Sequence, residues 1–482
     1  MKNEPSFLWH DYETFGAHAL FDRPAQFAAI RTNLALQPVG EPLNWYCQPA
    51  TDVLPHPIAC LVTGITPQEA HRKGLNEAEF AAKIHAEMME PGTCTAGYNS
   101  IHFDDEFSRN LFYRNFFDPY EREYKNNNSR WDLIDLCRMC YALRPAGITW
   151  PEHEPGKPSF KLEHLSAANN IEHEGAHEAL SDVLATIGLA RLIKERQPRL
   201  FDWALKMRDQ HHVMQMLHPV NPKPLLHTSS RIPAVRGCTT LVLPLSIYPD
   251  RKKSVIACDL MQDPEPLLNF TAEEISDRLY TPAADLPEGV DRIALKAIHG
   301  NHVPMIAPAS VLKDVDCQRI GLDPPRCFEH AEKLLAALPQ IRNKVMEVFR
   351  PYPPGADTDP DHMIYSGGFF SQHDRRLMDK VRATEPGRLA EMTLRFKDAR
   401  LPEMLFRYRA RNFPDTLSID ETRRWQEQRL QRLIQPADER QLNQRSFQLE
   451  VAAARQAHQE DKRAQNILDH VEAWGNSICE PR

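Results

Sequence analysis

Two acidic residues near the N-terminus are the first in the chain that could carry out chemistry. Asp11 and Glu13 follow the apolar run Phe7–Trp9, which is typical of a buried strand. Side chains alternate between the faces of a strand, so both carboxylates project from one face, about 7 Å apart. Carboxylates this close repel unless a cation lies between them, and hard divalent cations prefer oxygen ligands. The pair indicates a metal site, with two solvated acids at an exposed strand end as the alternative.

Two later segments supply further acids and a histidine. Asp104 begins a helix expected over residues 103–117, directly after a strand. Asp182 lies beside the apolar face of a long helix expected over residues 176–196, where an unpaired carboxylate would be costly. His177 stands at the start of that helix. Acids in a first helical turn also suit the helix dipole, and a histidine there can be a simple surface cap.

The elements that must position these side chains follow an α/β pattern. Thr66, Pro67 and Glu69 are typical of a helix cap. Strands followed by strand–helix alternation predict a mixed central sheet flanked by helices. Strands are expected over residues 7–12, 26–32, 43–47 and 93–98, and helices over residues 76–89, 103–117, 131–143, 162–169 and 176–196.

The pattern changes after Pro198. A helix is expected over residues 200–217 and helical sequence over 325–349, and the proline- and aspartate-rich segment 351–361 is typical of a linker. Helical patterns follow, including residues 417–474. Short β-like segments at residues 225–228, 238–245, 254–260 and 293–298 indicate a small barrel or curled sheet. We expect domains over residues 1–198, 199–351 and 355–482.

Composition narrows the class of protein. The 482 residues are 42% hydrophobic and 26% charged, as in an ordinary globular protein. The net charge of −8 is unlike that of a generic DNA-coating protein, but does not exclude an enzyme acting on nucleic acid. No apolar run of about 18 residues predicts a membrane span, and the N-terminus lacks a signal-peptide core, so we expect a cytoplasmic protein.

The ten cysteines are scattered, which indicates free thiols in a reducing compartment. Cys137 and Cys140 form a C-x-x-C pair inside a helical pattern. No second pair of ligands follows at zinc-finger spacing, so the pattern disfavours a zinc site there.

The acidic motifs, taken in order, resemble those of the DEDD exonuclease superfamily, in its His-containing branch. The motifs are Asp11-x-Glu13, Asp104 and His177-x-x-x-x-Asp182. Over essentially its whole length the chain also resembles the bacterial exonuclease I (exodeoxyribonuclease I) family. The segments that carry this resemblance are residues 10–16, 22–31, 129–133, 141–145 and 407–414.

The resemblance implies both a fold and an activity. The fold is an α/β, ribonuclease-H-like exonuclease domain with a mixed sheet, an SH3-like β-barrel domain and a C-terminal all-α domain. The activity is 3′→5′ hydrolysis of single-stranded DNA to deoxynucleoside 5′-monophosphates, in DNA repair and recombination. A 3′→5′ exoribonuclease or a proofreading exonuclease of the superfamily is one alternative, although these are usually shorter. A nonenzymatic DNA-binding scaffold is another, although the intact acids and His177 argue against it.

The resemblance also implies catalytic roles. Asp11, Glu13, Asp104 and Asp182 would hold two Mg²⁺ ions, with Mn²⁺ as a possible substitute, and Asp11 would bridge them. Two ions about 4 Å apart activate water and neutralise charge on the phosphate. His177 would accept the proton of the attacking water, because an imidazole titrates near neutral pH.

Single-stranded DNA is held by cations along its phosphates and by aromatic rings against its bases. Thr14–Gly16 is the expected edge at which the 3′ end enters. Phe369, Phe370 and residues 407–413 could help to close the groove, although core packing explains these aromatic residues equally well. A solvated surface charge or a core aromatic is the alternative for each DNA-facing position. By resemblance these positions are Glu13, Lys161, Arg109, Tyr120, Tyr124, Arg138, Arg144, Lys252, Lys253, Lys296 and Asn301.

The family implies one protein partner, the acidic C-terminal tail of single-strand DNA-binding protein. Its pocket requires a cation beside apolar side chains, for which Trp203, Lys223 and Lys313 are the candidates, together with Phe328. The chain departs from the family where Pro308 and Leu335 replace expected polar or basic residues. We expect a monomer without a membrane partner.

Overall fold

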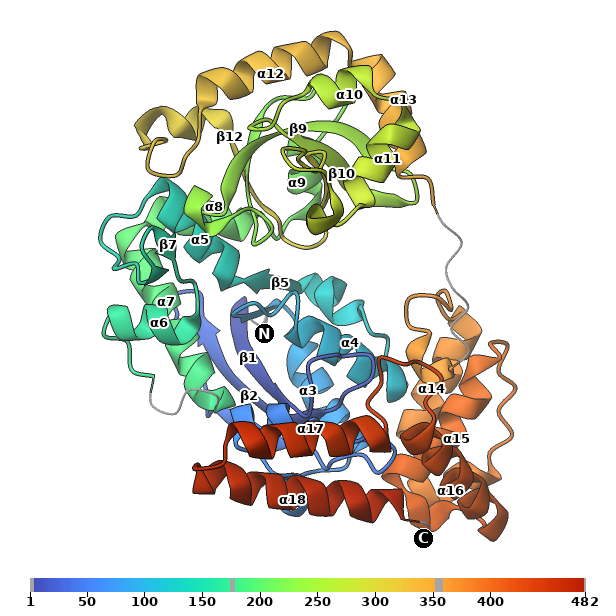
Figure 1. The fold of residues 1–482 in the computed structure, drawn as a ribbon. Coiled ribbons are helices and arrows are strands. Elements are labelled where there is room, and N and C mark those ends of the chain that lie inside the picture. Colours follow the sequence, from blue (N-terminus) through green and yellow to red (C-terminus); the bar gives the residue numbers. More distant parts are fainter. Residues whose placement is uncertain (1–3, 174–177, 352–358, 481–482) are drawn as a thin grey trace. The chain divides into compact units, whose positions relative to one another are not determined.

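The computed structural model describes residues 4–173, 178–351 and 359–480. The chain divides into two compact units. The first contains residues 1–129, 173–184 and 354–482, and the second contains residues 130–172 and 185–353. Figure 1 labels the elements of both units along the chain. The segment predicted as one exonuclease domain, residues 1–198, contributes to both units.

A mixed sheet forms the centre of the first unit, as predicted. The strands that lie wholly in this unit are β1 (Ser6–Thr14), β2 (Pro24–Asn33), β3 (Leu43–Tyr46) and β4 (Thr93–Gly97), in the order β3-β2-β1-β4 of a five-stranded sheet. The central strand β1 runs antiparallel to β2 and parallel to β4. Apolar residues bury one face of the sheet, because Leu8 and Phe27 pack with Phe80 and Ile84 in one cluster.

Helices cover this sheet and carry Asp104 and Asp182, two of the predicted metal ligands. The predicted cap at Thr66 is confirmed, since its side chain accepts a hydrogen bond from the Glu69 amide. The predicted helix over 103–117 is shorter, and Asp104 is its first residue. The helix containing Asp182 passes into the second unit after Leu184. These helices are α1 (Pro57–Thr63), α2 (Pro67–Lys73), α3 (Glu77–Met88), α4 (Asp104–Arg114) and α7 (Ala179–Arg196).

The C-terminal part of the first unit is helical, as predicted. Its α-helices are α14 (Gln372–Ala383), α15 (Arg400–Asn412), α16 (Ile419–Ile434), α17 (Gln444–Ala457) and α18 (Lys462–Cys479). The helices α17 and α18 lie side by side (Figure 1), and both also contact α1. Phe447 and Val471 share a buried cluster with Phe15 and Leu54, so the C-terminal helices complete the core beside the end of β1.

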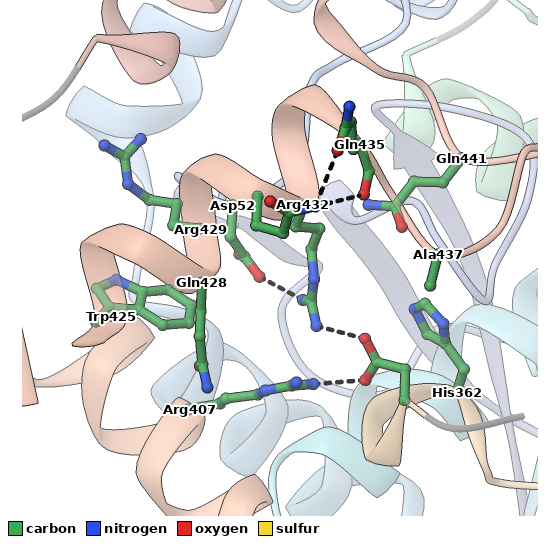
Figure 2. A pocket seen from close by; sticks show the side chains of 12 residues that line it. Asp52, His362, Arg407, Trp425, Gln428, Arg429, Arg432, Gln435, Ala437 and Gln441 are labelled. Atoms are coloured by element: carbon green, nitrogen blue, oxygen red, sulfur yellow. Dashed lines mark hydrogen bonds and ion pairs between the residues drawn. The ribbon is translucent and has the colours of Figure 1, made fainter.

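The first unit also contains a buried ion cluster. Asp361, only 2% exposed, accepts ion pairs from Arg411 at 2.6 Å and from Arg407 at 3.0 Å. Arg432 contacts both Asp361, at 3.4 Å, and Asp52, at 2.6 Å. Figure 2 shows Arg432 directed at Asp52, with Arg407 in the same cavity of about 380 Å³. The cluster joins the C-terminal helices to the loop after β3.

The second unit contains another sheet, of order β11-β10-β9-β8-β12. Its strands are β8 (Leu225–Thr228), β9 (Thr239–Tyr248), β10 (Arg251–Asp259), β11 (Leu295–His299) and β12 (Met305–Pro308). The edge strands β11 and β12 do not pair with each other within the described residues. This arrangement is the curled sheet that was one of the two predicted forms, and the ring of strands is not closed. The short strand β12, which ends at Pro308, was not predicted.

Helices surround this sheet with different bounds from those predicted. Trp131, predicted to be helical, lies in β5 (Ser129–Asp132) because α5 (Leu133–Leu143) is capped by Asp132. The helix predicted over residues 200–217 is two helices, the second capped by Asp209, and the stretch 325–349 is also two, separated at Ala337. The helices are α6 (Leu162–Ala168), α8 (Pro198–Lys206), α9 (Gln210–Met216), α10 (Glu265–Asn269), α11 (Ala272–Tyr280), α12 (Pro324–Ala336) and α13 (Leu338–Val348).

All ten cysteines are free. Among the described residues, no helix is both long and apolar enough to cross a membrane.

The ion cluster yields a stability prediction. Replacing Asp361 by Ala removes the carboxylate that Arg407, Arg411 and Arg432 share. Asp52 and Asp359 then remain to balance three buried positive charges. We expect the free energy of unfolding to fall by about 3–5 kcal/mol, measured by urea denaturation. Arg423→Ala, which removes an exposed pair with Asp420 at 3.6 Å, is the control and should change it little. Equal effects of the two substitutions would contradict this role of the cluster.

Candidate active site

The strand β1 presents Asp11 and Glu13 on one face, as the alternation of side chains predicts. The intervening Tyr12 points the other way and is 3% exposed, with its hydroxyl 3.1 Å from Ser108 Oγ. His10, on the same face as Tyr12, is 2% exposed. Burial of these two neighbours holds the strand so that the two acids face the same space.

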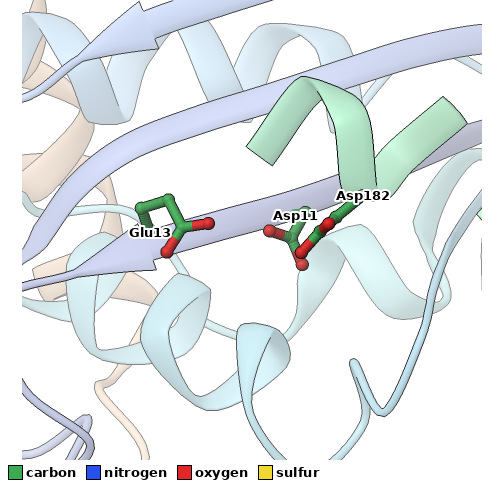
Figure 3. A group of neighbouring side chains, drawn as sticks. All are labelled: Asp11, Glu13 and Asp182. Atoms are coloured by element: carbon green, nitrogen blue, oxygen red, sulfur yellow. The ribbon is translucent and has the colours of Figure 1, made fainter. Parts of the chain in front are cut away.

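Asp182, in the first turn of α7, joins these two acids. One ligand oxygen from each of Asp11, Glu13 and Asp182 lies within 4.8 Å of the others. Figure 3 shows the carboxylates of Asp11 and Asp182 together, with that of Glu13 farther along β1. Three hard oxygen donors at this separation suit a divalent cation such as Mg²⁺ or Mn²⁺.

The fourth predicted acid, Asp104, lies beside this group. It is 2% exposed at the start of α4, and its Oδ1 accepts a hydrogen bond of 2.9 Å from the backbone amide of Tyr12. This bond ties the helix start to the strand that carries Asp11. The structure brings three of the four acids within 4.8 Å and places Asp104 close enough for its charge to act on Asp11.

Burial and mutual repulsion raise the pKa values of two of the acids, Asp11 and Glu13. Desolvation, followed by the charges of Asp104, Glu13 and Asp182, raises the pKa of Asp11 well above its usual value. Desolvation and the charges of Asp182 and Asp104 raise the pKa of Glu13 to about 8. A bound cation would favour the ionised forms, so the donor set and its electrostatics both fit a divalent metal.

Two histidines precede Asp182 in the chain. His177, the predicted general base, lies outside the described residues. His173, which we did not predict, places its Nε2 2.5 Å from Asp182 Oδ1. Its sequence signal is weak, because a histidine nine residues before an acid has no characteristic spacing.

The edge after β1 is tightly packed. Phe15 is 4% exposed, and Gly16 has no room for a side chain, since a Cβ there would lie 2.2 Å from Asp22 Oδ2. His56 Nε2 lies 3.5 Å from Asp22 and its Nδ1 lies 3.2 Å from Glu450 on α17. The segment predicted to admit the DNA end is therefore supported by a C-terminal helix.

The predicted DNA-facing residues of the first unit other than Glu13 are a buried arginine and two aromatic side chains. Arg109 is 5% exposed, pairs with Glu106 and Glu123, and stacks over the Tyr120 ring at 5.4 Å. A phosphate would have to compete with these two glutamates for its guanidinium. Arg109 therefore holds the Tyr120 ring in place, and its charge is already balanced by the two glutamates.

Several aromatic rings of this unit are exposed. Tyr120 contacts the ring of Phe369 edge-to-face at 5.9 Å, and Phe369 is 81% exposed. Tyr124 is 64% exposed and Tyr365 is 58% exposed. Core packing, the alternative that we considered for Phe369, does not describe so exposed a ring. Tyr365, which donates a hydrogen bond to Glu106, was missed because it follows the linker without a charged motif.

The second unit carries the other predicted DNA-facing residues. Lys161, Lys252, Lys253 and Asn301 are exposed. Lys296, on β11, has its pKa lowered to about 8 by desolvation, which neighbouring cations reinforce and Asp259 opposes. The four exposed side chains are accessible to a phosphate, whereas Lys296 is partly buried.

Two predicted DNA-facing arginines of this unit are engaged by neighbouring groups. Arg138 pairs with Asp135 at 2.6 Å. Arg144 donates to the carbonyls of Leu143 and Val311, and its side chain lines a cavity instead of standing free on the surface.

That cavity, of about 470 Å³, contains one of the three predicted partner-binding residues. Trp203 lines it and donates from Nε1 to the Ile306 carbonyl at 2.9 Å. Lys223 and Lys313 are exposed but do not line it, and Phe328 and Leu335 are 42% and 38% exposed. The lining residues are Leu143, Arg144, Gln197, Pro198, Arg199, Leu200, Trp203, Ala307 and Val311.

Three protein families match consecutive parts of the chain. Residues 8–190 match the family described as Exonuclease, residues 208–351 match the Exonuclease I SH3-like domain, and residues 358–478 match the Exonuclease I C-terminal domain. Together they span most of the sequence.

Individual relatives match over nearly their full length. Exodeoxyribonuclease I of Escherichia coli (strain K12) is 48% identical over 431 residues, covering 89% of this chain and 90% of that protein. The Haemophilus influenzae exodeoxyribonuclease I is 42% identical and covers 98% and 99%.

Solved structures of exonuclease I are also similar to this chain over nearly its full length. E. coli exonuclease I in complex with a dA16 oligonucleotide is similar with a TM-score of 0.94 at 44% identity, covering 98% of this chain and 100% of that one. The zinc-ion-bound form of the E. coli exonuclease–single-stranded DNA complex gives the same TM-score and identity, with 99% and 100% coverage.

The raised carboxylate pKa values predict an unusual pH dependence. Without metal, folded Glu13 keeps a proton up to about pH 8, whereas the unfolded chain releases it near its ordinary pKa of 4.5. Stability should therefore fall as pH rises from about 5 to 8, by about 1.4 kcal/mol for each unit of pKa difference. Urea denaturation in EDTA should show a shallower fall for Glu13→Gln, which cannot ionise.

The matched control for this measurement is Glu427→Gln, an exposed residue on α16. It should keep the wild-type pH profile. Parallel profiles for wild type and Glu13→Gln would show that repulsion at the site does not govern stability.

Proposed function

Because the chain belongs to the bacterial exodeoxyribonuclease I family, we propose that it hydrolyses single-stranded DNA from the 3′ end. The reaction depends on a divalent metal and releases deoxynucleoside 5′-monophosphates, in DNA repair and recombination. The observation that carries the proposal is the convergence of Asp11, Glu13 and Asp182 within 4.8 Å.

The residues of the site have separable tasks in this proposal. Asp11, Glu13, Asp104 and Asp182 would hold the metal, which when bound lowers the pKa of water and offsets charge on the phosphate. Mg²⁺ and Mn²⁺ suit an all-oxygen donor set, although a related E. coli complex holds zinc. His177, by its place in the motif, would accept the proton of the attacking water.

The substrate preference is proposed from the surface of the first unit. Tyr120, Tyr124 and Phe369 offer ring faces and edges to unstacked bases, and aromatic stacking tolerates any base. A duplex hides its base faces, so such a surface favours single strands. The E. coli relative that is similar in structure was solved with a dA16 oligonucleotide, which supports this choice over RNA trimming.

A strand-labelling assay tests the activity. With Mg²⁺, DNA labelled at its 3′ end should release labelled mononucleotide first, DNA labelled at its 5′ end should shorten progressively, and matched RNA should persist. EDTA should stop all release. Asp182→Ala should reduce the rate by about 100-fold or more, because charge on the reacting phosphate is no longer offset, while the protein stays folded.

Asp420→Ala, an exposed carboxylate on α16, serves as the control and should keep the wild-type rate. Efficient release from RNA would favour the exoribonuclease alternative. DNA binding by the wild-type protein without any release would favour a nonenzymatic scaffold.

We further propose that the Trp203 cavity receives the acidic C-terminal tail of single-strand DNA-binding protein. The cavity combines apolar walls, from Leu143, Leu200 and Val311, with the cations Arg144 and Arg199. An apolar pocket beside guanidinium groups is what a peptide ending in hydrophobic and acidic residues requires. The exposed lysines Lys223 and Lys313 would add only screened, longer-range attraction.

Trp203→Ala tests this partner. A buried tryptophan anchor contributes about 2 kcal/mol or more to such an interface, so the tail peptide should bind about 30-fold more weakly in fluorescence anisotropy at low salt. Tyr280→Ala, an exposed aromatic of the same unit, should leave affinity unchanged. The proposal fails if the wild-type protein does not bind the peptide, or if Trp203→Ala binds it equally well.

A further inference from the structure

The carboxylate of Asp182 has a close partner outside the acidic group. His173 Nε2 lies 2.5 Å from Asp182 Oδ1. The histidine side chain is 7% exposed and that of Asp182 is 20% exposed, so water competes little for this contact. The segment 173–184 belongs to the same compact unit as β1. The contact is therefore an internal feature of the site.

Asp182 needs such a partner more than Asp11 does. Asp11 stands on β1 opposite Ala28 of β2, just beyond the residues of β1 that pair with β4. Asp182 stands in the first turn of α7, where the Ser181 and Asp182 amides both bond to the Glu178 carbonyl. Those bonds hold its backbone but leave the rotation of its carboxylate open. A donor on one oxygen removes that freedom.

We propose that His173 is a positioning residue for the metal site, a role that rests on the proposed function. Its Nε2–H donates to Asp182 Oδ1 and turns the carboxylate toward Asp11 and Glu13. One held oxygen leaves the second oxygen and a remaining lone pair for a cation. His173 itself does not touch substrate, and the base role stays with His177.

The expected consequence is on metal affinity. Partners that hold a ligating carboxylate contribute about 10–100-fold to metal affinity or activity. Removing the donor would let Asp182 rotate away from the other acids, and the bound cation would have to restore its orientation. Once bound at saturating concentration, the cation would fix the same geometry, so the maximal rate would largely recover.

Mn²⁺ titration of the full chain by calorimetry tests the proposal. His173→Ala should weaken Mn²⁺ binding by about 10–100-fold and raise the Mn²⁺ concentration that half-activates nucleotide release. KM for single-stranded DNA should not change. His173→Gln places an amide N–H near the position of Nε2 and should restore affinity to within a few-fold of wild type. His470→Ala, an exposed histidine on α18, is the control.

Thermal unfolding in EDTA accompanies each variant. If the Ala variant is destabilised, His173→Leu replaces it, because leucine fills the space without a donor, and the Leu–Gln comparison decides. Unchanged Mn²⁺ affinity in both donor-free variants overturns the proposal. So does a Gln variant as weak as the Ala variant, which would show that the imidazole itself is required, or a lost maximal rate at unchanged affinity.

Mn²⁺ titration of the wild-type protein distinguishes failure of the role proposed for His173 from failure of the proposed exonuclease function. Wild-type protein that neither binds Mn²⁺ nor releases nucleotides refutes the proposed function. Wild-type protein that binds Mn²⁺ with the same affinity as His173→Ala refutes only the role of His173.

Discussion

Repulsion among carboxylates at the end of β1 is the constraint on which the rest of the first unit depends. Asp11, Glu13 and Asp182 crowd within 4.8 Å with Asp104 beside them. Without a cation, such a group opposes folding at neutral pH. Contacts elsewhere in the unit hold these acids in place despite their repulsion. The sheet holds β1, the Tyr12 amide holds Asp104, and His173 holds Asp182. Because the acids repel one another in the folded protein, a bound cation would stabilise the folded state, which is the basis of the proposed metal site.

The ion cluster in the same unit shows the opposite solution to buried charge. Although burial opposes ionisation, Arg411, Arg407 and Arg432 hold the pKa of Asp361 well below its usual value. The neighbouring charges that shift Asp11 are carboxylates, and its pKa rises. In the ion cluster, where Asp361 joins helices to the core, arginines of the same unit balance the charge of the aspartate. At the end of β1 the neighbouring charges are other carboxylates, and the proposed metal would neutralise them. This difference separates structural from functional charge.

The predicted DNA-facing residues likewise include charges that are already paired and side chains that carry no charge. Arg109 and Arg138, which the family resemblance predicted to face DNA, are already paired with acids. Phe369, which is 81% exposed and contacts Tyr120, carries no charge to neutralise. Stacking on exposed rings, more than pairing with these arginines, is therefore the contact that the proposed single-stranded substrate would make here, because a ring stacks on any base.

The sequence by itself determined the chemistry and much of the fold. Alternation along a strand placed Asp11 and Glu13 on one face, and capping residues such as Thr66 marked helix starts, because these are local consequences of backbone geometry. Tertiary structure alone decided three other features. It brought Asp182 from α7 to β1, set His173 against it, and left the second sheet unclosed. Contacts between distant segments depend on how elements pack, and side-chain pattern within one element does not encode that packing.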